Sequence, residues 1–309
     1  MKVALAQIAP VLLDREATLA KIVARIDEAA AGGCGLVAFG EALLPGYPQW
    51  LGSTDGARFD SPLQKRIHAR YIEAAVDVGG GDLDPVREAA ARGGIAVSMG
   101  LMERDAGRGK SLFCTAATIL PDGEIASTHR KLMPTYEERL SWTIGDGAGL
   151  VTHSIGEFTV GTLNCWENWM PLVRAAMYAQ GEDLHIASWP GGVHNTEALT
   201  PVIAREGRSF CLSVSGLLRG SDIPADFPGR EDWIESDAQL LNNGGSCIAG
   251  PDGEWVVEPV VGEERLIVAD LDLARVHEER HNFDPAGHYS RPDVLSLGID
   301  RSRPRSLNG

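Results

Sequence analysis

The cysteine at position 165 has the surroundings of a nucleophile rather than those of a core residue. It lies between a β-rich run, Phe158–Leu163, and a helical pattern with Pro171 in its first turn. Its nearest neighbours are polar or aromatic: Asn164, Trp166, Glu167 and Asn168. A side chain on such a tight turn is exposed, and a helix N-terminus favours a thiolate. We therefore predict a reactive thiolate here, although the position alone fits an inert thiol equally well.

Two charged residues also stand at the ends of strand-like runs. Glu41 follows Leu36–Phe39, and Lys131 follows Glu124–Arg130. Either one alone is typical of a solvated surface charge, but α/β proteins build their sites where strands end. Together with the thiolate they indicate one chemistry. The sulfur attacks an electrophilic carbon, the carboxylate takes and returns a proton, and the ammonium stabilises the charged tetrahedral intermediate.

Other common site motifs do not occur in the sequence. It contains no G-x-S-x-G turn, no P-loop, and no G-x-G-x-x-G after a strand. We expect the run Asn242-Asn243-Gly244-Gly245 to form a turn rather than a phosphate-binding loop. No CxxC pair or Cys/His cluster has the spacing of a zinc site. We therefore expect neither a cofactor nor a metal.

The remaining cysteines lie in apolar runs and are predicted to be small buried residues of strands: Cys34, Cys114, Cys211 and Cys247. The total of five is odd, so the cysteines cannot all pair within one chain. The first ten residues hold one lysine and a short apolar stretch broken by Gln7, which is unlike a secretory signal. We therefore expect free thiols and a reducing cytoplasm.

Composition and charge limit the class of protein. Of 309 residues, 44% are hydrophobic and 23% are charged, which is typical of a folded chain with its own core. The balance of 28 basic and 43 acidic residues gives a formal net charge of −15, which repels phosphate backbones and anionic lipid. No apolar run approaches the ~20 residues of a membrane span. We expect neither a nucleic acid nor a membrane as partner.

The elements that must position these residues alternate between strands and amphipathic helices, which indicates an α/β fold of sheets covered by helices. Strands are expected at Lys2–Ala9, Leu36–Phe39, Ile95–Met102, Ser111–Leu120, Glu124–Arg130, Phe158–Leu163, Leu184–Ser188, Phe210–Gly216, Ser246–Gly250, Trp255–Pro259 and Arg265–Leu271. Helices are expected from the cap Asp14 to Ala30 and at Pro62–Ala75, Pro85–Arg92, Pro171–Gln180 and Thr196–Arg208.

A Pro-Asp-Gly-Glu tetrapeptide twice joins two strand-like runs, at Pro121–Glu124 and Pro251–Glu254. Each is a hairpin signal, and its presence in both halves suggests two similar sheets. No Gly/Ser-rich or Pro-rich linker divides the chain, so one domain is favoured. From Asn282 onward the chain is polar and contains prolines, so we expect this segment to be disordered or to lie against another subunit.

The candidate residues, taken in order, resemble the nitrilase superfamily, the Glu-Lys-Cys carbon–nitrogen hydrolases. The matching blocks are Phe-Gly-Glu-Ala at 39–42 with Pro-Gly-Tyr-Pro at 45–48, His-Arg-Lys at 129–131 and Asn-Cys-Trp-Glu-Asn at 164–168. Met-Pro-Leu at 170–172 makes the last block similar to the nitrilase branch. The resemblance implies an αββα four-layer sandwich. Residues 1–281 would form the hydrolase domain and 282–309 a tail involved in subunit association.

The resemblance also implies a catalytic role for each matching residue. Glu41 is then the general base, Lys131 stabilises the intermediate and Cys165 is the nucleophile. Glu138, rather than the adjacent Glu137, matches the additional glutamate beside the lysine. The implied reaction consumes a nitrile and two waters and yields a carboxylic acid and ammonia without a cofactor.

Substrate contacts and assembly follow from the same resemblance. Tyr47 and Trp189 match positions that line the substrate pocket, and the main-chain N–H of Trp166 would help to bind the oxyanion. The family assembles through large surfaces, so a homodimer or larger homo-oligomer is expected. The sequence leaves the class of nitrile open, whether aliphatic, aromatic, arylacetonitrile or cyanide.

Alternative functions remain open from the sequence alone. The nearest are amide hydrolysis by the same residues and a hydratase outcome, in which the tetrahedral intermediate expels the thiol and releases an amide. A thiol peroxidase also uses an exposed cysteine but gives no role to Glu41 and Lys131. A non-catalytic oligomeric scaffold is a further alternative, and it has no need of all three residues.

Overall fold

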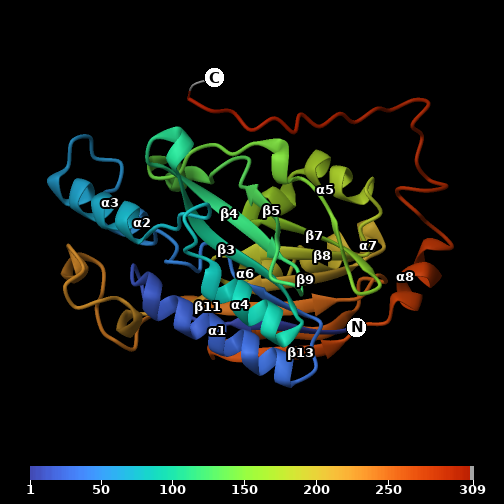
Figure 1. The fold of residues 1–309 in the computed structure, drawn as a ribbon, viewed down its shortest axis with the longest axis horizontal. Helices are drawn as coiled ribbons and strands as arrows, with labels where there is room; N and C mark the ends of the chain where they lie inside the picture. Colours follow the sequence, from blue (N-terminus) through green and yellow to red (C-terminus); the bar gives the residue numbers. More distant parts are fainter. Residues whose placement is uncertain (307–309) are drawn as a thin grey trace.

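The strand-like runs form two β-sheets that pack face to face, with helices on both outer sides (Figure 1). The computed structural model describes residues 1–306. In the first sheet the central strands β1, β2 and β3 are parallel, and each flanking strand pairs antiparallel with its neighbour. Its order is β13 (Arg265–Asp270), β1 (Lys2–Gln7), β2 (Leu36–Phe39), β3 (Ala96–Asp105), β4 (Ser111–Ile119) and β5 (Ile125–Arg130).

The second sheet has the same plan, with three parallel strands, β7, β8 and β9, and antiparallel flanks. Its order is β10 (Leu217–Arg219), β11 (Leu240–Ala249), β9 (Phe210–Ser215), β8 (Leu184–Trp189), β7 (Phe158–Asn164) and β6 (His153–Ile155), and β12 (Trp255–Val261) pairs with β11. The hairpins β4–β5 and β11–β12 span the two Pro-Asp-Gly-Glu turns, which confirms that prediction.

Apolar side chains fill the space between the sheets. Leu5 and Leu36 of the first sheet share one buried cluster with Phe158 and Leu212 of the second. Alternate side chains of each strand face outward and pack under helices, as the two-residue period of a strand requires. Helices α1 and α4 cover the first sheet, and α5 and α7 cover the second. The layers are helix, sheet, sheet and helix, so the predicted αββα sandwich is confirmed.

Helix ends follow the local capping signals. The side chain of Asp14 accepts from the N–H of Ala17 at 2.9 Å at the start of α1, as predicted. The predicted helix Thr196–Arg208 is instead two helices, because Pro201 cannot supply the N–H of a continuous helix. The helices are α1 (Arg15–Ala31), α2 (Trp50–Ser53), α3 (Pro62–Ala74), α4 (Asp84–Gly93), α5 (Pro171–Tyr178), α6 (Val193–Thr196), α7 (Thr200–Gly207) and α8 (Leu273–Arg280). Short 3₁₀ turns include η2 (Tyr136–Leu140) and η4 (Cys165–Trp169).

The run Asn242–Gly245 is not a turn, contrary to the sequence prediction. It lies inside β11, where the register with β12 shifts between Gly244 and Ser246. Gly244 and Gly245 have φ angles of +84° and +102°, which side chains rarely adopt. An added Cβ at Gly244 would meet the side chain of Gln7 at 2.5 Å. The glycines therefore form an irregularity within a strand rather than a connection between strands.

Most of the C-terminal segment is exposed, but part of it contacts the domain. Figure 1 shows it running from α8 across the surface of the domain. Arg303 pairs with Asp146 at 3.2 Å and donates to the carbonyl of Thr128 at 2.7 Å, and Ile299 packs against the cluster under α5. Residues near 299–304 therefore contact their own domain, whereas the sequence predicted a segment that is disordered or lies against another subunit. Residues 307–309 lie outside the described chain.

Within the described range 1–306, no helix has the length and apolar character needed to cross a membrane.

Candidate active site

The residues that were predicted to be catalytic lie together at a place where strands of both sheets end. Glu41 lies just beyond β2 and Lys131 just beyond β5 in the first sheet, and Cys165 directly follows β7 in the second. The side-chain oxygens of Glu41 and Glu138 and the sulfur of Cys165 all lie within 4.8 Å of one another. All four side chains are buried.

Lys131 lies at the centre of this group. Its Nζ is 2.8 Å from Oε1 of Glu41 and 2.7 Å from Oε2 of Glu138, and its side chain is 1% exposed. Burial alone lowers the pKa of a lysine, but here the neighbouring acidic groups, Cys165, Glu41 and Glu138, raise the pKa of Lys131 well above its usual range. The lysine is therefore an ammonium ion, as predicted.

Glu41 has one oxygen engaged and one free. Its Oε1 binds Lys131 and accepts from the Cys114 thiol at an S···O distance of 3.4 Å. Its Oε2 is buried without a hydrogen-bond partner in the described chain. Burial raises the pKa of Glu41 to about 7, Lys131 opposes this rise, and Glu138 adds to it. A carboxylate with this pKa and a free oxygen is suited to take and return a proton near neutral pH.

Glu138 is held by three donors. It accepts from Lys131, from the hydroxyl of Tyr47 at 2.9 Å and from the N–H of Thr135 at 2.6 Å. The last contact is part of a capping box at the start of η2. The adjacent Glu137 is partly exposed, and its side chain forms no hydrogen bond or ion pair with any other residue of the range 1–306. The structure therefore turns Glu138, and not Glu137, toward the lysine.

Cys165 lies on a strained turn with φ +45° and is 3% exposed. Burial and then the charge of Glu41 raise the pKa of Cys165 well above its usual range, although Lys131 and the N–H of Trp166 lower it. The expectation of an exposed thiolate at a helix N-terminus is therefore wrong. The cysteine is a buried thiol at the start of a 3₁₀ turn, so its sulfur becomes nucleophilic only when a nearby base takes the proton.

Two groups near the site were not singled out from the sequence. Cys114 was assigned to the core, but the pairing of β4 with β5 brings it opposite Lys131. The main-chain N–H of Lys131 donates to the carbonyl of Cys114 at 2.8 Å. Glu167 was noted only as a neighbour of Cys165. The spacing Asn-x-x-Glu from Asn164 to Glu167 is a capping-box signal that could have found it.

The residues that could bind a metal ion are Glu41, Glu138 and Cys165, two carboxylates and a thiol. The ammonium of Lys131 already binds one oxygen of each carboxylate. A cation at this position would have to approach the ammonium closely, and like charges repel. The donor set is therefore poorly suited to a metal while Lys131 is in place.

Comparison with known proteins decides the family. Residues 2–281 match the sequence model of the family described as Carbon-nitrogen hydrolase. The chain belongs to this family. An aliphatic nitrilase from Sinorhizobium fredii (strain HH103) is 39% identical over 99% of this chain and 97% of its own length. An aliphatic nitrilase from Rhodococcus rhodochrous is 36% identical over 97% and 79%. A bifunctional nitrilase/nitrile hydratase from Nicotiana tabacum is 36% identical over 94% and 83%.

A solved structure agrees with the fold. The amidase from Nesterenkonia sp. AN1 superposes with a TM-score of 0.68 at 20% identity, covering 91% of this chain and 97% of the amidase. At that identity the likeness concerns the sandwich fold. The predicted family resemblance is confirmed, and the protein is a hydrolase of carbon–nitrogen bonds.

The three residues predicted to contact substrate have different environments in this carbon–nitrogen hydrolase. Tyr47 lines a cavity of about 20 Å³ together with Glu41 and apolar residues that include Leu43 and Leu217. Trp189 is fully buried in β8, and its carbonyl accepts from the N–H of Glu41 at 3.1 Å. Trp166 is 53% exposed and lines a separate hollow of about 250 Å³ beside η2. The structure thus brings only Tyr47 to a cavity that includes Glu41.

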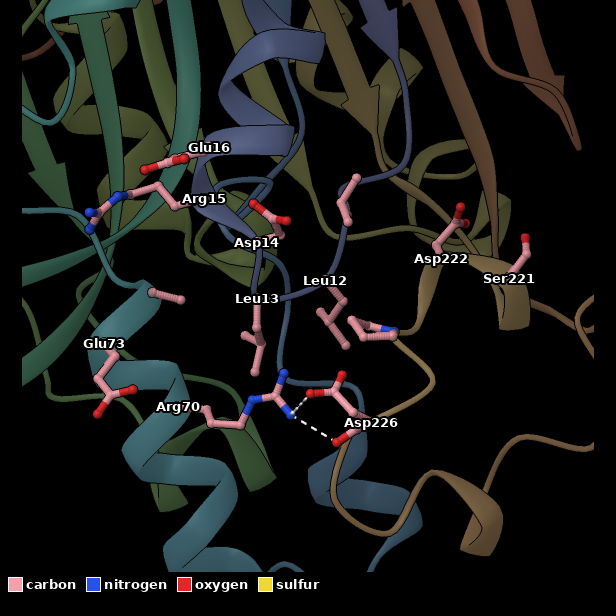
Figure 2. A pocket seen from close by; sticks show the side chains of 13 residues that line it. Leu12, Leu13, Asp14, Arg15, Glu16, Arg70, Glu73, Ser221, Asp222 and Asp226 are labelled. Carbon is pink, nitrogen blue, oxygen red and sulfur yellow. Dashed lines mark hydrogen bonds and ion pairs between the residues drawn. The ribbon is translucent and has the colours of Figure 1, made fainter.

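A larger cavity lies away from this chemistry. It measures about 560 Å³ and lies between the start of α1, α3 and the loop at residues 221–226 (Figure 2). Two of its lining arginines form ion pairs, Arg70 with Asp226 at 3.3 Å and Arg15 with Asp82 at 3.0 Å. The described residues that line it include none of the predicted site residues.

Proposed function

We propose that this carbon–nitrogen hydrolase is a nitrilase, which converts an organic nitrile to the carboxylic acid and ammonia. The supporting observation is the set of relatives named nitrilases, 36–39% identical over nearly the whole chain. The buried group of Glu41, Lys131, Glu138 and Cys165 supplies the chemistry that such a reaction needs.

The first step forms a bond between sulfur and carbon. Glu41 takes the proton of the Cys165 thiol on its free Oε2, and the sulfur attacks the nitrile carbon. The nitrile nitrogen gains negative charge as the triple bond opens, and Lys131 and the N–H of Trp166 stabilise that charge. Glu41 passes the thiol proton to this nitrogen, which completes a covalent thioimidate and leaves Glu41 ionised.

Two waters complete the reaction. Glu41 removes a proton from the first water as its oxygen adds to the thioimidate carbon, and it returns that proton to the nitrogen. The other proton of that water, now on the hydroxyl group, then passes to the nitrogen as the carbonyl of the thioester forms, and ammonia leaves. The remaining thioester is attacked by a second water in the same way. Breaking the carbon–sulfur bond releases the acid and restores the thiol. Glu138 holds the ammonium of Lys131 in place throughout.

Amide release is a second candidate outcome. The relative from Nicotiana tabacum is described as a bifunctional nitrilase/nitrile hydratase, so one scaffold of this family serves both products. In this chain the same tetrahedral intermediate yields an amide if it expels sulfur instead of ammonia. The proportion of acid and amide depends on which leaving group is protonated first.

A panel of nitriles with matched amides tests the proposal, with ammonia, acid and amide all quantified. We expect ammonia and acid in equal amounts from at least one nitrile and slower release from its matched amide. The variant Cys165→Ala serves as the control for turnover at this site. Faster hydrolysis of amides than of all nitriles would identify the protein as an amidase.

The proposal also covers the oligomeric state of the protein, its cellular compartment and its substrate contacts. We infer a homodimer or larger homo-oligomer, with residues 282–309 contributing to association. Five free cysteines support a reducing cytoplasm as the location. We assign Tyr47, Trp166 and Trp189 to the surroundings of the substrate, with Tyr47 supported most directly by its position beside Glu41 and its bond to Glu138.

A further inference from the structure

The nucleophile and the lysine of the site are carried by different sheets. Lys131 follows β5 at the edge of the first sheet, and Cys165 follows β7 in the second. Strands of the two sheets are not paired in one ladder. The apolar contacts between the sheets have no preferred direction. A fixed separation of ammonium and thiol therefore requires a directional contact between the two strand ends.

The carboxylate of Glu167 makes that contact. Its Oε1 accepts from the N–H of Leu132 at 2.6 Å, directly after Lys131. Its Oε2 accepts from the N–H of Asn164 at 2.9 Å, directly before Cys165. Nε2 of His129 lies 3.1 and 3.0 Å from the same two oxygens. One side chain thus bonds to the backbone of both turns.

The bridge is buried and charged. The side chain of Glu167 is 0% exposed. Burial raises the pKa of a carboxylic acid, but here His129 and the two N–H donors lower the pKa of Glu167 below its usual value. The group is therefore a carboxylate, and hydrogen bonds to a charged acceptor are shorter and stronger than neutral ones.

We propose that Glu167 is a positioning residue whose carboxylate ties the turn after Lys131 to the turn before Cys165 and thereby sets the distance between ammonium and sulfur. The inference rests on the proposed function for the roles of Lys131 and Cys165. It does not depend on whether the enzyme prefers nitriles or amides.

The variant Glu167→Gln tests this role. It keeps the size of the side chain but turns an N–H₂ group toward one of the two main-chain donors, which weakens the bridge. The matched control is Asp183→Asn. Asp183 is also a largely buried acid that accepts from a main-chain N–H, that of Thr159 at 3.0 Å, at the opposite end of β7. A general loss of packing around β7 affects both variants, whereas a loss of positioning affects only the first.

The decisive measurement is the pH dependence of Cys165 alkylation by iodoacetamide, followed by peptide mass. The charged groups that face Cys165 are Glu41, Glu138 and Lys131. A retreat of the ammonium from about 4 to about 5 Å, at an effective dielectric constant of ~20, moves the midpoint up by roughly 0.6 pH unit. We expect this rise in Glu167→Gln, together with a ~10²-fold lower kcat and a nearly unchanged KM on the best substrate of the panel.

An unchanged alkylation midpoint in a folded Glu167→Gln, or an equal shift in Asp183→Asn, would overturn the positioning role. If Glu167→Gln does not fold, His129→Gln is used in its place. It keeps both main-chain donors but removes the imidazole that lowers the pKa of Glu167, so the bridge loses part of its charge and weakens. A smaller rise of the same sign therefore supports the proposal, and no rise refutes it. Because alkylation needs no turnover, failure of the wild type on every nitrile and amide would refute the proposed function and leave this test intact.

Discussion

Replacing Glu138 by glutamine tests the electrostatic core of the site. The carboxylate lies 2.7 Å from Nζ of Lys131, and it accepts from Tyr47 and Thr135 as well. Glutamine has the same shape and keeps one carbonyl oxygen for these donors, but it removes one of the two negative charges that hold the ammonium.

The size of the effect follows from the remaining partner. Removing one member of a buried ion pair costs ~3–5 kcal/mol when the other charge is left alone. Here Glu41 stays 2.8 Å from the same ammonium, so the loss of folding stability should be well below that range. The loss in catalysis should be larger, because one preorganised electrostatic partner is typically worth ~10²–10³-fold in rate. We expect Glu138→Gln to be folded and nearly inactive.

The adjacent residue provides the control. Glu137 is partly exposed, and within residues 1–306 it forms neither a hydrogen bond nor an ion pair, so Glu137→Gln should stay within about ±0.5 kcal/mol in stability and close to wild type in rate. The assay is initial-rate ammonia release from the best nitrile, with thermal unfolding of all three proteins. Loss of activity in the Glu137 variant alone would refute the assignment, and equal activity of both variants would remove the second glutamate from the mechanism.

Four further predictions concern the nucleophile, the base and the tail. Cys165→Ala should fold and release no ammonia from any nitrile; residual turnover above roughly a tenth of wild type would exclude Cys165 as the nucleophile. Burial raises the pKa of Glu41 to about 7, and the base must be ionised, so kcat/KM should fall as the pH drops below about 7. The Cys114 thiol lowers the pKa of Glu41, so Cys114→Ala should move this acidic limb to higher pH, whereas a change at a buried cysteine outside the site should leave it in place. Removing residues 301–309 should preserve ammonia release. Removing all residues after 282 should lower the oligomer mass measured by light scattering. An unchanged mass in the longer truncation would count against a role of the tail in association.

The sequence by itself determined most of the fold and predicted which side chains meet at the candidate site. Short β-rich runs located the strands, and the cap Asp14 and the two Pro-Asp-Gly-Glu turns placed a helix start and two hairpins, because these signals act within a few residues. Motif order indicated the family, and the spacing from Lys131 selected Glu138 over Glu137. All of these are local properties of the chain.

Only the tertiary structure decided the protonation state of the site and the contacts that hold it. The pKa of Cys165 depends on burial and on charges brought from β2, β5 and η2, so its local turn predicted a thiolate where the folded chain has a thiol. Strand pairing placed Cys114 beside Glu41, and the packing of two sheets placed Glu167 between Lys131 and Cys165. The contacts of Leu132 with Glu167 and of Cys114 with Glu41 join residues that are 35 and 73 positions apart. Burial and long-range distance are set by how the sheets pack, and no local pattern in the sequence contains them.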